Sequence, residues 1–184
     1  MWTIAGSLIV LPATTRTDLL AEPVTAALAA LDPALAARCG VAEIDPELAD
    51  TAAFCQTYGS PLDVSANCVV VAGKRGGETR YAACVVLATT RADVNGVVRK
   101  RLDVRKASFA PMDDAVERTG MAYGGITPLG LPSDWPLLID SAVAATDEVV
   151  VGSGVRHSKL IVPGELLTKL ASAEVVEGLG RPVG

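Results

Sequence analysis

The stretch of sequence that is most informative about the fold reads Gly124-Gly125-Ile126-Thr127-Pro128-Leu129-Gly130. Its adjacent glycines, β-branched residue, small hydroxyl residue and proline predict a stiff bend with little side-chain bulk. Glycine reaches backbone dihedrals that other residues avoid, and proline fixes its own φ. Such a bend lets backbone N–H groups approach a ligand closely. A purely structural turn has the same composition, so the surrounding segments must decide between the two interpretations.

The segments on either side of this loop predict short elements of both kinds. We expect strands at residues 4–11, 41–44, 67–72, 80–89, 137–140, 148–151 and 160–162. We expect helices at residues 18–31, 46–58, 93–102, 113–119 and 165–170. The strands at 67–72 and 80–89 should form a hairpin across residues 73–77. Short strands mixed with short helices, without a regular βαβ rhythm, predict a single α+β domain with a curved mixed β-sheet and surrounding short helices.

The composition excludes several classes of protein. A chain of 184 residues with 50% hydrophobic residues is long enough for one domain with a substantial core. No stretch reaches the ~18 apolar residues of a membrane span, so we expect no membrane contact and a cytoplasmic location. The four cysteines have no CxxC spacing and there is a single histidine, His157, so we expect reduced thiols, no metal site and no cofactor.

In element order and in this loop, the chain resembles the YbaK/ProX-like aminoacyl-tRNA deacylases, which are related to the editing domain of bacterial prolyl-tRNA synthetases. The resemblance covers roughly residues 43–178. It rests on Thr51-Ala52-Ala53, Cys68-Val69-Val70-Val71, Arg99-Lys100-Arg101-Leu102, Ala107-Ser108-Phe109-Ala110, the Gly124–Pro128 loop, Leu137-Leu138-Ile139-Asp140 and Val149-Val150-Val151-Gly152-Ser153-Gly154. It divides the chain into an N-terminal strand–helix addition at residues 1–40, packed on the same domain, and an editing-like domain at residues 41–184.

The resemblance implies hydrolysis, in trans, of the ester of a mischarged aminoacyl-tRNA that carries a small amino acid. It implies aminoacyl-tRNA and an aminoacyl-tRNA synthetase as partners. One departure leaves a second interpretation open. In the family that the chain resembles, a lysine typically opens the strand that corresponds to residues 67–71. This chain has Asn67 at that position. The alternative is therefore a catalytically weak or inactive family member that binds tRNA or a small ligand, and hydrolysis of another acyl ester or amide is a third.

Ester hydrolysis places negative charge on the former carbonyl oxygen, so the site needs preorganised donors and a positioned water. We expect Asn67 and the backbone of Gly124, Gly125, Ile126 and Thr127 to form the catalytic part of the site. The residues expected to bind substrate are Thr51, Pro128, Gly152, Ser153, Gly154 and Lys159. Lys159 either supplies the positive charge that the missing lysine would provide, or is a neutral substitution without a role in the site.

Strand alternation predicts that Asn67 faces the pocket and that Cys68 faces away, as a buried small residue rather than a nucleophile. Trp135 follows the loop and either stacks on a terminal adenine or covers the core.

A short basic run contrasts with the net charge of −5. The residues expected to contact tRNA phosphates are Arg99, Lys100, Arg101, Arg105 and Lys106. A solvated helix face is the alternative interpretation of this run.

Overall fold

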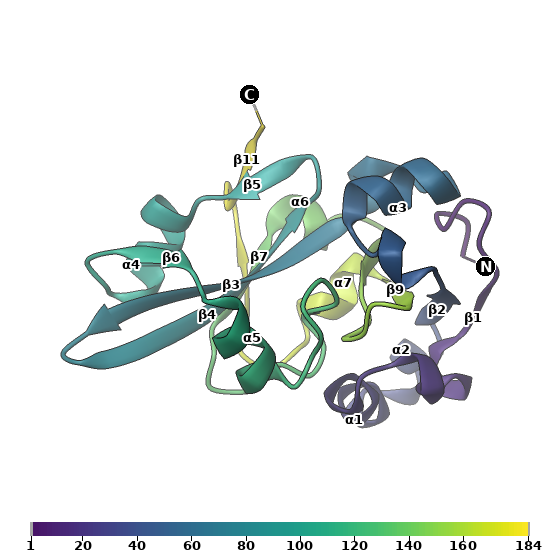
Figure 1. Ribbon diagram of the computed structural model, residues 1–184, viewed down its shortest axis with the longest axis horizontal. Helices are drawn as coiled ribbons and strands as arrows, with labels where there is room; N and C mark the ends of the chain where they lie inside the picture. The colour runs from purple at the N-terminus through teal and green to yellow at the C-terminus, as the bar shows by residue number, and fades with distance from the viewer. Residues whose placement is uncertain (1, 184) are drawn as a thin grey trace.

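Two main β-sheets form the framework of the molecule, whose computed structural model describes residues 2–183 (Figure 1). The first sheet has the order β1-β2-β9-β8 and is antiparallel throughout. Its strands are β1 (Val10–Pro12), β2 (Gly40–Glu43), β8 (Val149–Gly152) and β9 (Ser158–Val162). The second sheet has the order β10-β7-β4-β3-β6 and is mixed, because β7 runs parallel to both β4 and β10. Its strands are β3 (Ala66–Arg75), β4 (Glu78–Leu87), β6 (Ala107–Phe109), β7 (Leu137–Asp140) and β10 (Ala173–Val176).

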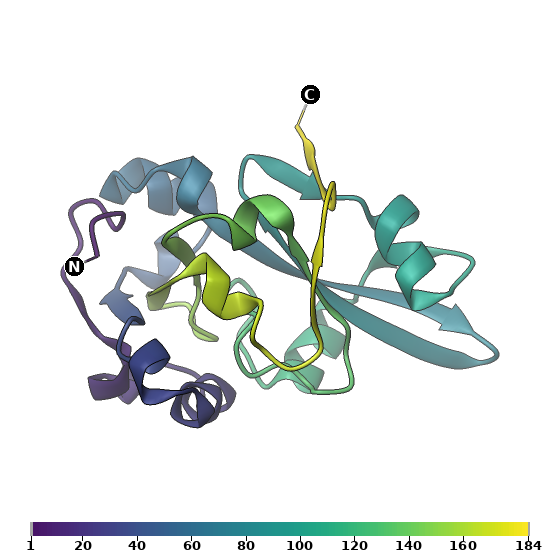
Figure 2. The ribbon, with the colours of Figure 1, turned by 180° about the vertical axis from the view of Figure 1, so that it is seen from behind.

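A bridge between Ser65 and Val150 links the two sheets where β3 begins. Seen from behind, the C-terminal segment runs along the second sheet and ends near β5 (Figure 2). There β11 (Gly180–Pro182) pairs with β5 (Thr90–Ala92) in a small third sheet. The predicted α+β class with a mixed sheet is therefore confirmed, with the strands shared among three sheets.

The helices are short, as the sequence predicted. They are α1 (Glu22–Ala30), α2 (Pro33–Ala36), α3 (Thr51–Tyr58), α4 (Arg99–Leu102), α5 (Met112–Thr119), α6 (Ser141–Ala144) and α7 (Gly164–Leu167). A π-helical turn, η5 (Val94–Val98), leads directly into α4. The 3-10 turns are η1 (Ala13–Thr15), η2 (Thr17–Leu19), η3 (Pro46–Leu48) and η4 (Leu62–Val64).

Several predicted elements, among them the helices at residues 18–31, 93–102 and 165–170, are wrong in extent, and two further cases have a clear local reason. The strand at residues 4–11 shrinks to β1, because Gly6 takes a φ of +62° and Ser7 donates its N–H to the Tyr58 carbonyl. The helix at residues 46–58 divides into η3 and α3. Asp50 interrupts it, since its carboxylate accepts the N–H groups of Ala52 and Ala53 and so begins a new helix.

The N-terminal residues pack on the same core as the first sheet. Leu19, Val24 and Leu28 belong to one buried cluster with Leu160 and Val162 of β9. In addition, the Ser158 hydroxyl donates to the Leu19 carbonyl (2.5 Å), and the Ala21 N–H donates to the Ser153 carbonyl (3.1 Å). The N-terminal segment therefore packs against the β8–β9 connection and holds it by these two hydrogen bonds.

The β3–β4 hairpin is confirmed, and it leaves parts of two strand edges unpaired. Its strands run to a Gly76-Gly77 turn, three residues beyond the predicted end of the first strand. On its outer side β3 pairs with β6 only at residues 71–73. On its outer side β4 pairs with β7 only at residues 83–85. A cavity borders each of these open stretches.

Candidate active site

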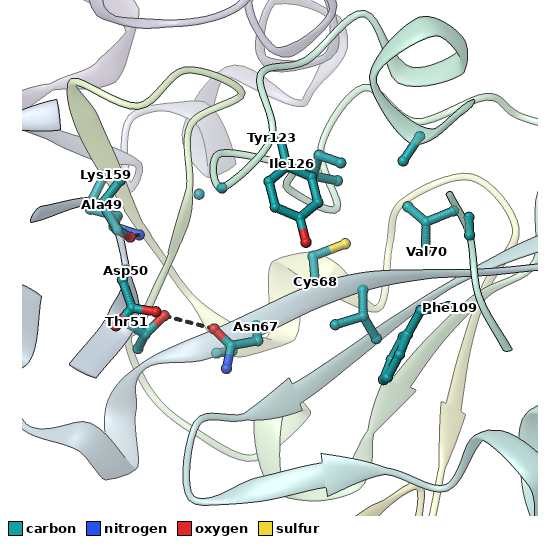
Figure 3. Close-up of a pocket in the computed structure, with 16 residues that line it drawn as sticks. Ala49, Asp50, Thr51, Asn67, Cys68, Val70, Phe109, Tyr123, Ile126 and Lys159 are labelled. Carbon is teal, nitrogen blue, oxygen red and sulfur yellow. Dashed lines mark hydrogen bonds between the residues drawn. The ribbon is translucent and has the colours of Figure 1, made fainter. Parts of the chain in front are cut away.

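A cavity of about 420 Å³ lies along the open edge of β3 (Figure 3). One end is polar and the other is apolar. The polar end is lined by Ala49, Asp50, Thr51, Asn67 and Lys159. The apolar end is lined by Val70, Phe109, Ala110, Ala115, Tyr123 and Ile126. Gly124 and Gly152 complete the wall between them, and Ala66, Cys68 and Val69 form the floor on β3.

The main chain of β3 also faces this cavity. The Val70 carbonyl accepts the Ala110 N–H (2.8 Å), so the polar main-chain groups of Val70 point away from β4. Because strand main-chain groups alternate in direction, those of Cys68 point the same way. At Cys68 no strand pairs with β3 on this side within residues 2–183. The edge therefore offers a donor and an acceptor to a ligand.

Asn67 is held by the first residue of α3. The Thr51 hydroxyl donates to Asn67 Oδ1 (2.7 Å), as Figure 3 shows. Since the carboxamide oxygen accepts this bond, the carboxamide NH₂ is the donor that Asn67 can offer to a ligand.

Lys159 is a buried cation in the wall of the cavity. Its side chain comes from β9, is 7% exposed, and donates from Nζ to the Ala49 carbonyl (2.8 Å). Nζ also lies 5.5 Å from the centre of the Phe54 ring. Burial lowers the pKa of Lys159 below its ordinary value, and the nearby Cys55 and Asp50 partly oppose this shift. Among the described residues Lys159 forms no ion pair, so its charge is compensated mainly by a carbonyl dipole.

Gly125 and Gly152 are explained by the contact between the two loops. A Cβ on Gly152 would lie 2.5 Å from the Gly125 carbonyl oxygen, and one on Gly125 would lie 2.5 Å from the Val155 carbonyl oxygen. The Gly154 N–H donates to the Gly125 carbonyl (2.7 Å). The main chains of the loops thus pack directly together, which leaves no room for side chains between them.

Several of the expected site residues lie behind this contact and do not line the cavity. The Gly125 N–H donates to the Ala122 carbonyl (2.9 Å), so it closes a turn. Thr127 is fully buried and its hydroxyl has no hydrogen-bond partner within the described chain. Pro128, Ser153 and Gly154 are also absent from the lining. Ser153 is buried, and its hydroxyl donates to the Ser158 carbonyl (3.1 Å).

The expectation that Cys68 faces away from the pocket is wrong. The cavity wraps over the open edge of β3, so residues from both faces of the strand reach it, and Cys68 lies beneath Tyr123 and Ile126 (Figure 3). Burial is the main cause that raises the pKa of the Cys68 thiol far above its ordinary value. The thiol therefore stays protonated at neutral pH, which argues against a nucleophile.

The basic run lies away from the cavity, on α4 and the segment that follows it. None of Arg99, Lys100, Arg101, Arg105 and Lys106 lines the cavity. Arg101 forms an ion pair with Glu174, and Arg99 donates to the Asn95 carbonyl (2.8 Å). Trp135 is 6% exposed and stacks on Tyr81, so it covers the core and offers no free face for a base.

Asp50, Tyr123 and Phe109 are among the lining residues that the sequence interpretation missed. Asp50 had a usable signal, because an aspartate before Thr51-Ala52-Ala53 is a typical helix N-cap. Tyr123 directly precedes the glycine pair. Phe109 enters the wall because β6 ends beside the open edge of β3, and no local pattern reports such a pairing.

The described residues contain no group of three His, Cys, Asp or Glu side chains placed to hold a metal ion. None of their helices is long and apolar enough to cross a membrane. All four cysteines are free thiols.

The fold and the cavity define a single-domain α+β protein with a binding site at an open strand edge. Over residues 45–170, more than half of its length, the sequence matches the family described as aminoacyl-tRNA editing domain. The chain belongs to this family, and membership is consistent with aminoacyl-tRNA deacylase activity.

Solved structures share the fold at low sequence identity. One, described as a candidate trans-editing enzyme for prolyl tRNA synthetase, has a TM-score of 0.69 and 20% identity, covering 86% of this chain and 97% of its own. A second, described only as a hypothetical protein, has a TM-score of 0.66 and 18% identity, covering 77% and 90%. A third, from work on grafting epitopes onto scaffold proteins, has a TM-score of 0.69 and 18% identity, covering 89% and 100%. At these identities the likeness establishes the fold alone.

Proposed function

We propose that this protein hydrolyses, in trans, the ester bond of a mischarged aminoacyl-tRNA that carries a small amino acid. The observation that carries the proposal is the convergence of Lys159, Asn67, Gly124 and Ile126 on one cavity. These groups come from separate parts of the chain, and family membership supplies the reaction class.

In this proposal the ester carbonyl lies at the polar end of the cavity. The Asn67 NH₂ donates to the carbonyl oxygen, and Lys159 supplies the positive charge that stabilises the oxyanion of the tetrahedral intermediate. Water attacks the carbonyl carbon, the ester C–O bond breaks, and the ribose hydroxyl takes a proton as it leaves. Preorganised donors of this kind are each worth about 10²–10³ in rate.

The remaining lining residues fix the substrate. The open edge of β3 and the Asp50 carboxylate suit the α-amino group of an aminoacyl ester, which carries positive charge. Ala110, Ala115 and Val70 bound the apolar end, which would hold a small side chain. The basic residues Arg99–Lys106 would meet tRNA phosphates outside the cavity.

A deacylation assay on a panel of aminoacyl-tRNAs tests the proposal. We expect turnover of one or two substrates with small amino acids, lost in both Asn67→Ala and Lys159→Met. If a folded wild-type protein turns over none of the substrates, the proposed deacylase activity is rejected.

A catalytically weak binding protein is the second candidate function. It is favoured by one specific observation, the hydrogen bond that already ties Lys159 Nζ to the Ala49 carbonyl. Tight binding of deacylated tRNA without turnover would select this function.

A further inference from the structure

The positive charge of the chain is concentrated in one structural unit. Nine of its 16 Lys and Arg residues, but only three of its 21 Asp and Glu residues, lie between positions 66 and 111. This segment builds the β3–β4 hairpin, η5, α4 and β6. Figure 1 shows that the unit projects from the end of the molecule opposite the N-terminus. A strongly acidic protein thus has a basic end.

A second cavity lies at this end, along the open edge of β4. It is lined by Thr79, Arg80, Tyr81, Arg101, Leu102, Arg118, Asp134, Trp135 and Pro136. We call it the β4-edge groove. It is separate from the first cavity, with which it shares no lining residue.

The strand register directs main-chain donors into the β4-edge groove. The Ala83 N–H points away from β3 and donates to the Pro136 carbonyl (3.0 Å). By alternation along the strand, the N–H groups of Tyr81 and Thr79 point the same way. The pairing of β4 with β7 begins only at Ala83, so these donors precede it.

Three guanidinium groups from three elements surround those donors. Arg80 of β4 donates to the Leu102 carbonyl (2.9 Å), and Arg101 of α4 pairs with Glu174. Arg118 of α5 lies with Cζ 4.5 Å from the centre of the Tyr81 ring. Arg118 takes part in no ion pair within residues 2–183.

Acidic side chains nearby balance the positive charge of Arg80 and Arg101 more than that of Arg118, since Arg80 and Arg101 form ion pairs and Arg118 forms none within residues 2–183. Asp134 lines the groove, Asp103 lies 3.6 Å from Arg80, and Asp114 accepts the Tyr81 hydroxyl (3.3 Å). Arg118 remains the guanidinium with the most freedom to meet an added anion.

We propose that the β4-edge groove binds backbone phosphates of the tRNA, and so holds the body of the substrate whose acyl end enters the first cavity. This inference rests on the proposed function. Guanidinium groups bind phosphate oxygens in a bidentate manner, and main-chain N–H groups add donors of fixed direction. Tyr81 and Trp135 are buried, so the groove has no free ring on which a base could stack. The contact is therefore to the backbone and does not read sequence.

The groove favours a nucleic acid over an added peptide strand. The open edge spans only the few residues before Ala83, too short for the extended main-chain pairing that strand addition uses. The donors belong to the β4 edge and to side chains on α4 and α5, so they converge from different directions. A compact phosphate group can accept from several directions, whereas an extended peptide strand pairs along one edge only.

The test measures binding of deacylated tRNA by fluorescence anisotropy at several salt concentrations. The variants are Arg118→Gln alone and together with Arg80→Gln. Arg38→Gln is the matched control, because Arg38 is an exposed arginine that also forms an ion pair, with Glu165, in another part of the molecule. Thermal unfolding of each variant establishes that it is folded.

We expect the double variant to weaken binding by about tenfold or more. The slope of log affinity against log salt should also decrease by about one for each phosphate that the variant no longer binds. We expect Arg38→Gln to bind like the wild type. Unchanged affinity and slope in the folded double variant would overturn the proposal, as would competition by an acidic peptide but not by RNA.

Hydrolysis of an aminoacyl ester of adenosine, which lacks the tRNA body, separates this inference from the proposed function. All groove variants should hydrolyse that small ester at the wild-type rate. A wild type that cleaves the small ester but binds no tRNA would reject the groove and keep the hydrolase. A wild type that binds tRNA through the groove but cleaves neither substrate would reject the hydrolase alone.

Discussion

The Thr51 hydroxyl donates a 2.7 Å hydrogen bond to the side-chain oxygen of Asn67, across the gap between the start of α3 and the open edge of β3. This bond determines the orientation of the Asn67 carboxamide, because the oxygen is the accepting atom. The donor NH₂ of Asn67 is then the group presented to a ligand.

Loss of either partner should reduce activity, but to different degrees. Asn67→Ala removes the donor, and we expect a fall in kcat of about 10²-fold. Thr51→Val leaves the donor in place but frees its orientation, so we expect a smaller fall, with rescue by Thr51→Ser. Steady-state kinetics on the preferred aminoacyl-tRNA measures both. Equal activity of Thr51→Val and the wild type would show that the hydrogen bond has no positioning role.

Lys159 should be needed for activity while reducing stability. A buried cation without an ion pair is costly, so Lys159→Met should raise the free energy of unfolding by about 1–3 kcal/mol and abolish most turnover. Urea unfolding and kinetics on the same preparations measure the two effects. A Lys159→Met protein that is less stable than the wild type would contradict this account of its burial.

The pH dependence should also follow from Lys159. Its pKa is lowered in the folded state, so between that value and its ordinary pKa the unfolded chain binds more protons and stability rises with pH. Over the same range activity should fall, as the stabilising charge is lost. Lys159→Arg should keep its charge and remove the fall. A wild-type profile that is flat up to about pH 10, near the ordinary pKa of a lysine, would argue against a catalytic charge at this position.

Gly152→Ala should damage the site through packing. Its added Cβ would lie within 3 Å of the Gly125 and Ile126 carbonyl oxygens, which are main-chain atoms and yield only if the loops separate. We expect a loss of about 1–3 kcal/mol of stability together with most of the activity. Gly77→Ala is the control. It places its methyl where no atom lies within 4 Å, so it should lower stability through backbone strain but leave activity unchanged.

The two roles of Asp50 can be separated by substitution. Asp50→Ser keeps a side-chain cap for α3 and removes the carboxylate, so the melting temperature should hold while KM rises. Asp50→Ala removes both and should in addition cost about 1 kcal/mol of stability. If Asp50→Ser leaves KM unchanged, the carboxylate does not contact the substrate.

Cys68→Ala should retain activity within a few-fold, because the high pKa of this thiol leaves almost no thiolate at neutral pH. A loss as large as that of Asn67→Ala, in a folded protein, would reopen a covalent mechanism.

The fold was largely predictable from local patterns, and the site only in part. The hairpin, β7 and α5 follow from continuous apolar runs, a glycine turn and a helical period, which are all local signals. The wrapping of the cavity over the β3 edge depends on where β6 stops pairing, and that is set by tertiary packing. For the same reason the orientation of Cys68 was predicted wrongly from alternation alone.

The sequence identified the glycines of the two loops as candidates for ligand contact, but Gly125 and Gly152 are required where the two loops contact each other. Sequence cannot separate these cases, because close approach of a backbone and close approach of a ligand place the same demand on side-chain size. Lys159 could be named as a candidate, whereas its burial against Ala49 and Phe54 could not.

The contact between the two glycine loops has a consequence for how this pocket could diversify. The part of the wall formed by Gly124 and Gly152 has no side chains to exchange, and a side chain added at Gly152 would force two main chains apart. If the proposed function holds, variation in the acyl group accepted should therefore come from lining residues that carry side chains, such as Val70, Ala110 and Ala115. New specificities should arise by changes in β3, α5 and the residue that follows β6, while Gly124 and Gly152 stay unchanged.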